Sequence, residues 1–197
     1  MKQLQTRAEA GEAAAENDLG AAYETGEGVT RDLSAALRWY TRAAEHGLAI
    51  AQCNLGILHD TGTGVPQNSA EAVRWYQRAA NQGDAPAKYL LARKYANGEG
   101  VEQNIAEAIR LYLEAAEQNI TPAQYNLGML YFKGRGVPQN LMEAGKWFHC
   151  AGIVGDPDAQ RALRMLRELM PQDEFLESKR LATSFLAKQR LSARQRR

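Results

Sequence analysis

The feature of this sequence that most constrains its fold is a motif that recurs every 36 residues without a change of phase. Its leucine occurs at five equally spaced positions, which are Leu19, Leu55, Leu91, Leu127 and Leu163. A pair of glycines follows in four copies, at Gly26 and Gly28, Gly62 and Gly64, Gly98 and Gly100, and Gly134 and Gly136. A fixed period of this length is typical of solenoids, in which each repeat buries its apolar surface against its neighbours.

Each copy contains two helical patterns, and the glycines separate them. In the first pattern the apolar residues recur at i, i+4, i+7 and i+8, as in Ala123, Leu127, Leu130 and Tyr131. In the second pattern they recur at i, i+3, i+4, i+7 and i+8, as in Ala72, Trp75, Tyr76, Ala79 and Ala80. Neither helix can bury its stripe alone, so we expect the two to pair and the chain to be all-α.

Polar residues before the second pattern predict where its helix begins. Asn68 is followed three residues later by Glu71, and the same spacing recurs at Asn140 and Glu143. An Asn at the N-cap with a Glu at the third helical position satisfies backbone N–H groups that have no partner within the helix. Asp32 has no such Glu, but its carboxylate suits the N-cap of the first copy.

The combined motif resembles the Sel1-like repeat family, a relative of the tetratricopeptide repeat. The matching elements are LG-x-x-Y, G-x-GV-x-x-[DN], A-x-x-WY-x-x-AA and a closing Gly, over about residues 12 to 167. Four positions depart from the pattern: His59, Ala92, Leu111 and Asn119. The resemblance implies a right-handed α/α superhelical solenoid that serves as a scaffold or adaptor for other proteins, commonly in bacteria.

The repeat phase divides the chain into segments. We predict a partial N-terminal capping helix over 1–11 and a solenoid over 12–169, with copies at 12–47, 48–83, 84–119 and 120–155 and a half copy at 156–169. After Pro171 the phase is lost, and we predict a C-terminal capping helix over 170–189 and a disordered basic tail over 190–197. Because the chain opens inside a second helix of the pattern, residues 2–10 are either a cap or the end of further repeats upstream.

Charge is distributed unevenly along the chain. The last 19 residues contain seven of the 24 Lys and Arg residues and none of the 23 Asp and Glu residues, whereas the net charge is only +1. One alternative function is therefore binding of an anionic surface or nucleic acid through the basic tail. We favour a solvated tail, because no aromatic residue follows Phe185 to stack on bases.

The sequence contains no recognisable catalytic, cofactor or metal site. Motifs of serine and metal hydrolases, such as Ser-x-x-Lys, Gly-x-Ser-x-Gly and His-Glu-x-x-His, are absent. The soft ligands do not cluster along the repeats: His46, His59, His149, Cys53 and Cys150. We expect a non-enzymatic protein with two free thiols and no cofactor. The alternative is a secreted or periplasmic hydrolase-like or penicillin-binding activity, since some relatives have been linked to penicillin.

The predicted binding surface is the concave groove formed by the first helices, where a peptide or helix of a partner protein would lie. Opposite the core stripe, the fourth copy carries a second stripe at i, i+4 and i+7, namely Tyr125, Met129 and Phe132. Its equivalents are Tyr89, Arg93 and Ala96, then Cys53, Ile57 and Asp60, then Asn17, Ala21 and Glu24. The stripe thus grades from polar to apolar, which packing alone does not require.

We predict nine partner-binding residues from this stripe: Asn17, Glu24, Ile57, Asp60, Tyr89, Arg93, Tyr125, Met129 and Phe132. An aromatic and Met cluster beside an Arg has the composition of a binding hot spot. The alternative is that these are packing residues of the repeat. No small-molecule substrate is expected, and no run of residues is long and apolar enough for a membrane span. We expect the bacterial cytoplasm, or the periplasm or secretion if a leader precedes the sequence.

Overall fold

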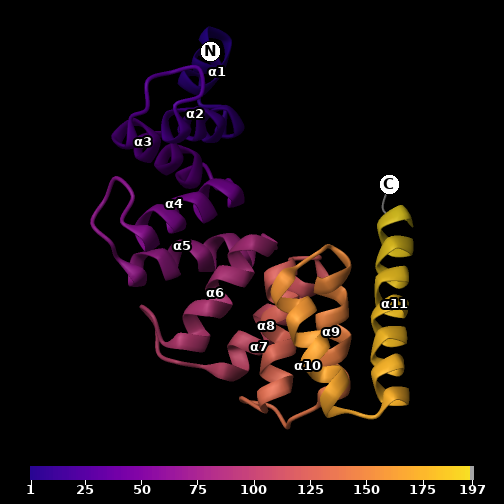
Figure 1. Ribbon diagram of the computed structural model, residues 1–197. Coiled ribbons are helices and arrows are strands. Elements are labelled where there is room, and N and C mark those ends of the chain that lie inside the picture. The colour runs from indigo at the N-terminus through magenta and orange to yellow at the C-terminus, as the bar shows by residue number, and fades with distance from the viewer. Residues whose placement is uncertain (196–197) are drawn as a thin grey trace. The chain divides into compact units, whose positions relative to one another are not determined.

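The computed structural model describes residues 1–195, and over that range it contains eleven helices and no strand (Figure 1). The helices form two compact units, divided after Asn104. The first unit contains α1 (Lys2–Glu9), α2 (Ala13–Thr25), α3 (Leu33–Glu45), α4 (Ala49–Thr61), α5 (Ser69–Asn81) and α6 (Ala85–Asn97). The second contains α7 (Ile105–Glu117), α8 (Thr121–Lys133), α9 (Leu141–Ile153), α10 (Pro157–Leu169) and α11 (Gln172–Gln195). The predicted all-α solenoid is confirmed.

The helix starts agree with the predicted caps. The Asn68 side chain accepts a hydrogen bond of 3.0 Å from the backbone N–H of Glu71, and Asn140 accepts one of 3.0 Å from that of Glu143. Asp32 caps α3 in the same way without a Glu at the third position. In the four full copies the first helix ends at a glycine in the left-handed region, for example Gly62 with φ of 72°, whereas α10 ends at Met170 in extended conformation.

In the second and fourth repeats the two helices approach closely because a glycine faces an aromatic ring. A Cβ added at Gly56 in α4 would lie 2.6 Å from the Tyr76 ring of α5. Gly128 in α8 stands in the same relation to the Phe148 ring of α9, also at 2.6 Å. Only glycine leaves room for the ring at these two positions, so the ring lies directly on the backbone of the first helix.

The core is divided among several clusters along the chain. In the first unit, Trp75 of α5 packs against alanines of α3 and against Ala51 and Leu55 of α4, so one repeat buries its Trp on the preceding one. In the second unit, Phe148 belongs to a cluster with Ala162 and Leu166 of α10. Burial between consecutive repeats is the source of stability expected of a solenoid.

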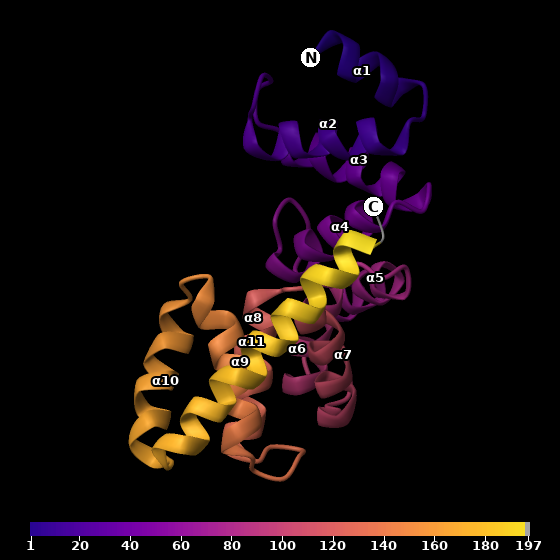
Figure 2. The ribbon, with the colours of Figure 1, turned by 90° about the vertical axis from the view of Figure 1, so that its right-hand side faces the viewer.

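The last helix packs chiefly on α9, and Figure 2 shows it crossing that helix. Phe185 meets the Trp147 ring edge-on at a centroid distance of 5.1 Å, and Phe175 meets the His149 ring at 5.2 Å. Ser178 lies against Gly145, where an added Cβ would be 2.6 Å from its hydroxyl oxygen. The residues that anchor α11 thus recur along one of its faces.

The predicted disordered tail is wrong for residues 190–195, because α11 continues to Gln195. No Gly or Pro follows Pro171, and the segment is rich in Ala, Leu, Arg, Lys and Gln, which favour helix. Once α9 holds the middle of α11, extending the helix needs no further nucleation. Residues 196 and 197 of the predicted tail lie outside the described range.

The ring-on-glycine contact predicts the effect of adding one methyl group. Gly128→Ala should lower the free energy of unfolding by about 1–3 kcal/mol, because the methyl group overlaps the Phe148 ring. This loss should exceed the gain of about 0.5–1 kcal/mol in helix propensity. Urea unfolding followed by circular dichroism measures the change.

Gly152→Ala is the matched control in the same unit. Its Cβ would meet only the flexible end of Leu163, at 3.2 Å, so the variant should be neutral or slightly more stable. Equal destabilisation of both variants would contradict the role given to the Phe148 contact.

A buried histidine predicts a pH dependence of stability. His149 is 9% exposed, and its Nε2 has no hydrogen-bond partner. Burial, with a smaller effect of Lys179, lowers the pKa of His149 to about 4. The unfolded chain takes up this proton near pH 6.5 and the folded chain only near pH 4. The contribution of His149 is therefore intact above about pH 6.5, and stability is lost as pH falls from there toward 4.

His149→Leu should remove this dependence, and Leu already occupies the equivalent position 113. Between pH 7 and pH 5 the wild type should lose about 1–2 kcal/mol more than the variant in urea unfolding. Parallel losses in the two proteins would show that His149 does not cause the effect.

Candidate partner-binding surface

All nine predicted partner-binding residues lie on first helices of the repeats. Asn17 and Glu24 are on α2, Ile57 and Asp60 on α4, and Tyr89 and Arg93 on α6, all in the first unit. The remaining three, Tyr125, Met129 and Phe132, are on α8 in the second unit. Each unit therefore contains part of the predicted set.

The two carboxylates of the set pair with tyrosines of the second helix in their own repeat. The Tyr40 hydroxyl donates a hydrogen bond of 2.8 Å to Glu24 Oε2. Tyr76 occupies the equivalent position; burial, and then the charge of Asp60 and a hydrogen bond to it, raise the pKa of this tyrosine. Both carboxylates are half-buried and are engaged within the fold.

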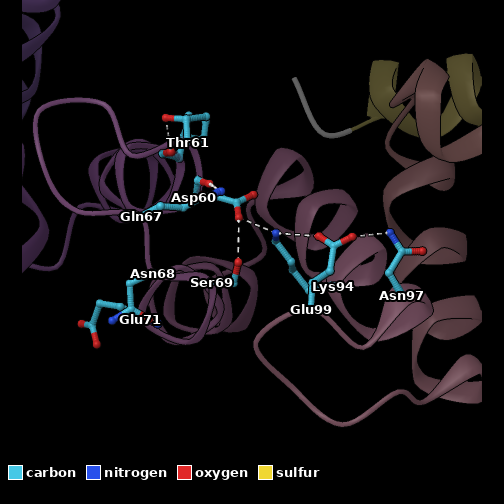
Figure 3. A network of polar contacts seen from close by, with 10 residues as sticks. Asp60, Thr61, Gln67, Asn68, Ser69, Glu71, Lys94, Asn97 and Glu99 are labelled. Atoms are coloured by element: carbon cyan, nitrogen blue, oxygen red, sulfur yellow. Dashed lines mark hydrogen bonds and ion pairs between the residues drawn. The ribbon is translucent and has the colours of Figure 1, made fainter.

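Asp60 is also the centre of a polar network between consecutive repeats (Figure 3). Lys94 of α6 is only 5% exposed, and its ammonium pairs with Asp60 and, at 2.9 Å, with Glu99. The Ser69 hydroxyl at the start of α5 donates to Asp60 Oδ1 at 3.5 Å. Hydrogen bonds from Lys94 and then Asn97 lower the pKa of Glu99. The network ties α4 to α6, and Asp60 is committed to it.

The other four residues of the first unit differ in exposure. Asn17 is buried and accepts a hydrogen bond of 3.0 Å from Asn54, which links α2 to α4. Ile57 and Tyr89 are half-buried. Arg93 is exposed, and its charge influences the pKa values of Tyr76 and Glu99 without an ion pair. Arg93 is thus the charged residue of this part of the set that faces solvent.

The three residues of the second unit lie together but pack inward. Tyr125, Met129 and Phe132 are half-buried against the cluster that contains Phe148 and Leu166. The Tyr125 and Phe148 rings are tilted with centroids 5.8 Å apart. Burial raises the pKa of Tyr125, as do nearby acidic groups at the start of α10. These side chains contribute to the core between α8, α9 and α10.

One column of the stripe changes from carboxylates to apolar residues along the chain. In the first two copies a carboxylate of the first helix lies beside a tyrosine of the second, as in the Glu24–Tyr40 and Asp60–Tyr76 pairs, whereas the third copy has Ala96 with Tyr112. In the fourth copy both positions are phenylalanine, at Phe132 and Phe148. The ring of the second helix thus matches the residue of the first helix in the first, second and fourth copies, and the third copy departs from this pattern.

Sequence reasoning missed two buried charges that the repeats could have indicated. Lys94 stands where the other copies have Ala22, Leu58 and Leu130, so a charge replaces an apolar residue. Glu16 is fully buried and pairs with Arg42 at 2.9 Å and with His46 Nδ1 at 2.8 Å, whereas two equivalent positions are Gln. A buried charge requires a partner, so each substitution points to a contact.

The two thiols offer little nucleophilic chemistry. Both cysteines are free and buried, and burial raises the pKa of Cys53 to about 12 and that of Cys150 to about 11. A thiolate is therefore scarce at neutral pH. Across residues 1–195, no group of three or more His, Cys, Asp or Glu residues could hold a metal ion. Over the same residues, no helix is both long and apolar enough for a bilayer span.

A protein-family model described as the Sel1 repeat matches four consecutive segments, at 13–48, 49–84, 85–120 and 121–156. Each segment begins one residue after the copy predicted from the sequence. No curated protein gives a significant match.

Several solved structures resemble the chain. The protective antigen c5321 of uropathogenic Escherichia coli, which has an SLR fold, is 34% identical with a TM-score of 0.84 over 96% of this chain. A Sel1 repeat protein of Oxalobacter formigenes is 30% identical with a TM-score of 0.80 over 97% of this chain and 78% of its own. A Klebsiella pneumoniae protein described as a sel1 repeat protein is 25% identical with a TM-score of 0.59, over 96% of this chain and 91% of its own. The chain spans 41% of the E. coli protein.

The buried ion pair predicts that removing a buried charge lowers stability more than removing an exposed one. Asp60→Asn should lower the free energy of unfolding by about 3 kcal/mol, because Lys94 stays buried with only Glu99 as its anionic partner. Arg74→Ala removes an exposed pair with Glu71 and should cost less than about 1 kcal/mol. Chemical denaturation of both variants measures the difference, and similar losses would refute a structural role for Asp60.

Proposed function

Because the chain belongs to the Sel1 repeat family, whose members are generally protein-interaction scaffolds, we propose that it binds a peptide or helix of a protein partner along the first helices of its repeats. The partner segment would carry a mixed apolar and acidic face. The contact region would centre on Arg93, Tyr89 and Ile57 in the first unit.

The observation that carries this proposal is the exposure of Arg93 beside a buried Lys94. The two cations are adjacent in α6, yet two carboxylates neutralise Lys94, whereas Arg93 extends to solvent without an ion pair. Tyr89 lies one turn earlier on the same helix and is half-buried. Arg93 provides charge, and Tyr89 provides apolar area with little loss of conformational entropy, a combination that favours a binding hot spot.

The internal contacts narrow the proposed surface. Asn17, Glu24 and Asp60 are engaged within the first unit, and Tyr125, Met129 and Phe132 pack in the core of the second. We therefore give these six a supporting role, in which they shape the helices that present the contact residues.

A non-enzymatic role is the simplest reading of the chemistry. The family is generally a non-catalytic scaffold family. Both cysteines have raised pKa values, and the described residues contain no candidate metal cluster. No observation favours the hydrolase-like or penicillin-binding alternative, or binding of an anionic surface or nucleic acid through the basic tail.

A charge reversal tests the proposal. Arg93→Glu should weaken binding of a specific partner at least about tenfold, because an acidic side chain would then face an acidic segment. Affinity enrichment with quantitative mass spectrometry identifies the partner, and titration calorimetry with the purified partner measures the dissociation constant.

Arg38→Glu is the matched control. Arg38 is exposed on α3, a second helix of the repeat, so its reversal changes the net charge equally on another face. Circular dichroism establishes that both variants fold. Loss of the partner with both variants, or retention with both, would contradict the proposed surface.

A further inference from the structure

Two faces of α11 have different roles. One face holds Phe175, Ser178, Ala182 and Phe185 and packs against α9. On the opposite face, residues recur at i, i+4, i+7, i+11, i+15 and i+18: Leu176, Arg180, Thr183, Ala187, Leu191 and Arg194. This is the alternating spacing of four and three residues by which one helix contacts another along its length. Leu176 is 44% exposed and Leu191 is 59% exposed.

Charge on α11 is segregated from one end to the other. The first turns contain Asp173, Glu174 and Glu177, and no acidic residue follows before the helix ends. Basic residues follow, first Lys179 and Arg180 and then, in the C-terminal half, Lys188, Arg190 and Arg194, all of them exposed. Two such helices laid antiparallel place the acidic end of each beside the basic end of the other.

We propose that α11 pairs antiparallel with α11 of a second copy of the chain, across a two-fold axis near Thr183 and Ser184. In this arrangement Leu176 meets Leu191 of the second copy, and Asp173 and Glu177 face Arg194 and Lys188 of the second copy. The interface is self-complementary, as a two-fold dimer requires, because each contact occurs twice.

The centre of the outer face suits close approach. Thr183, Ser184 and Ala187 have small side chains and line, with Leu176, Lys179 and Arg180, a surface depression of about 520 Å³. Small residues at a crossing point let two helices pack near the lower end of the ~8–10 Å interaxial range. The exposed ion pair between Glu177 and Arg180, at 3.3 Å, contributes little and leaves Glu177 available to a second copy.

A second copy fits this face better than a bilayer or a nucleic acid does. Leu176 and Leu191 are separated by about 22 Å along the helix, so they form no continuous apolar face to insert into lipid. Phe175 and Phe185 are turned toward α9, which leaves no aromatic ring for base stacking. The acidic first turns would also be repelled by any uniformly anionic surface.

The pairing goes beyond the proposed scaffold function and uses another surface, so either can fail without the other. One helix pair falls at the small end of specific interfaces, below about 1,200 Å². We therefore expect a dissociation constant in the micromolar range, about 1–100 μM. Salt should weaken the dimer because its charges are exposed.

Sedimentation-velocity ultracentrifugation of the full chain, from about 1 to 200 μM at low salt, tests the pairing. The wild type should shift from monomer to dimer over this range. Leu191→Glu should raise the dissociation constant at least about tenfold, because its carboxylate replaces a Leu–Leu contact beside the acidic end of the second copy. Ile50→Glu, at a 51% exposed position on α4, should leave the dimer unchanged.

A charge swap tests the orientation of the two helices. Lys188→Glu should dissociate the dimer by facing Glu177 of the second copy, and Glu177→Lys combined with Lys188→Glu should restore it. Circular dichroism excludes unfolding as the cause. A monomeric wild type over the whole range, a dimer indifferent to Leu191→Glu, or a double variant that stays monomeric would overturn the proposal. So would a monomer that cosediments with phosphatidylserine vesicles through Lys188 and Arg194, which would assign this face to anionic surfaces.

Discussion

The contact that sets the close packing of helix pairs in the second and fourth repeats is an aromatic ring lying on a glycine of the neighbouring helix. Gly56 receives Tyr76 and Gly128 receives Phe148, and a methyl group at either glycine would overlap the ring. The missing side chain sets the distance between the two helices of a pair. That distance in turn determines which side chains contact the other helix of the pair. They include residues that the sequence predicted to bind a partner protein.

The hydroxyl group of the tyrosine ring determines which residues of the first helix are engaged within the fold and which are available for binding. A tyrosine hydroxyl in a buried setting requires an acceptor, so Glu24 and Asp60 turn toward Tyr40 and Tyr76. Asp60 then attracts Lys94 from the next repeat. Arg93, adjacent in sequence, is exposed to solvent.

Much of the fold follows from the sequence because the repeat itself reports it. The 36-residue spacing predicts paired helices, and the N-cap side chains of Asn68 and Asn140 mark where helices begin. The candidate site was less predictable, because one helix stripe shows which residues share a face but not what lies opposite. The helix stripe indicates that Asp60 is exposed, because it does not show the partners of Asp60 on α5 and α6. The length of α11 was missed because basic composition suggests disorder, whereas packing on α9 favours helix.

The pairing of ring and opposing residue also limits how repeats of this chain can be exchanged. Solenoids grow and shrink by duplication and loss of whole units, which treats the units as equivalent modules. Here a first helix that carries Asp60 matches a tyrosine, and one that carries Phe132 matches a phenylalanine. Recombination with a break inside the glycine turn would join a carboxylate to a ring that cannot donate a hydrogen bond. Such a hybrid would lose the hydrogen bond between ring and carboxylate, and Lys94 of the third copy likewise depends on Asp60 of the second.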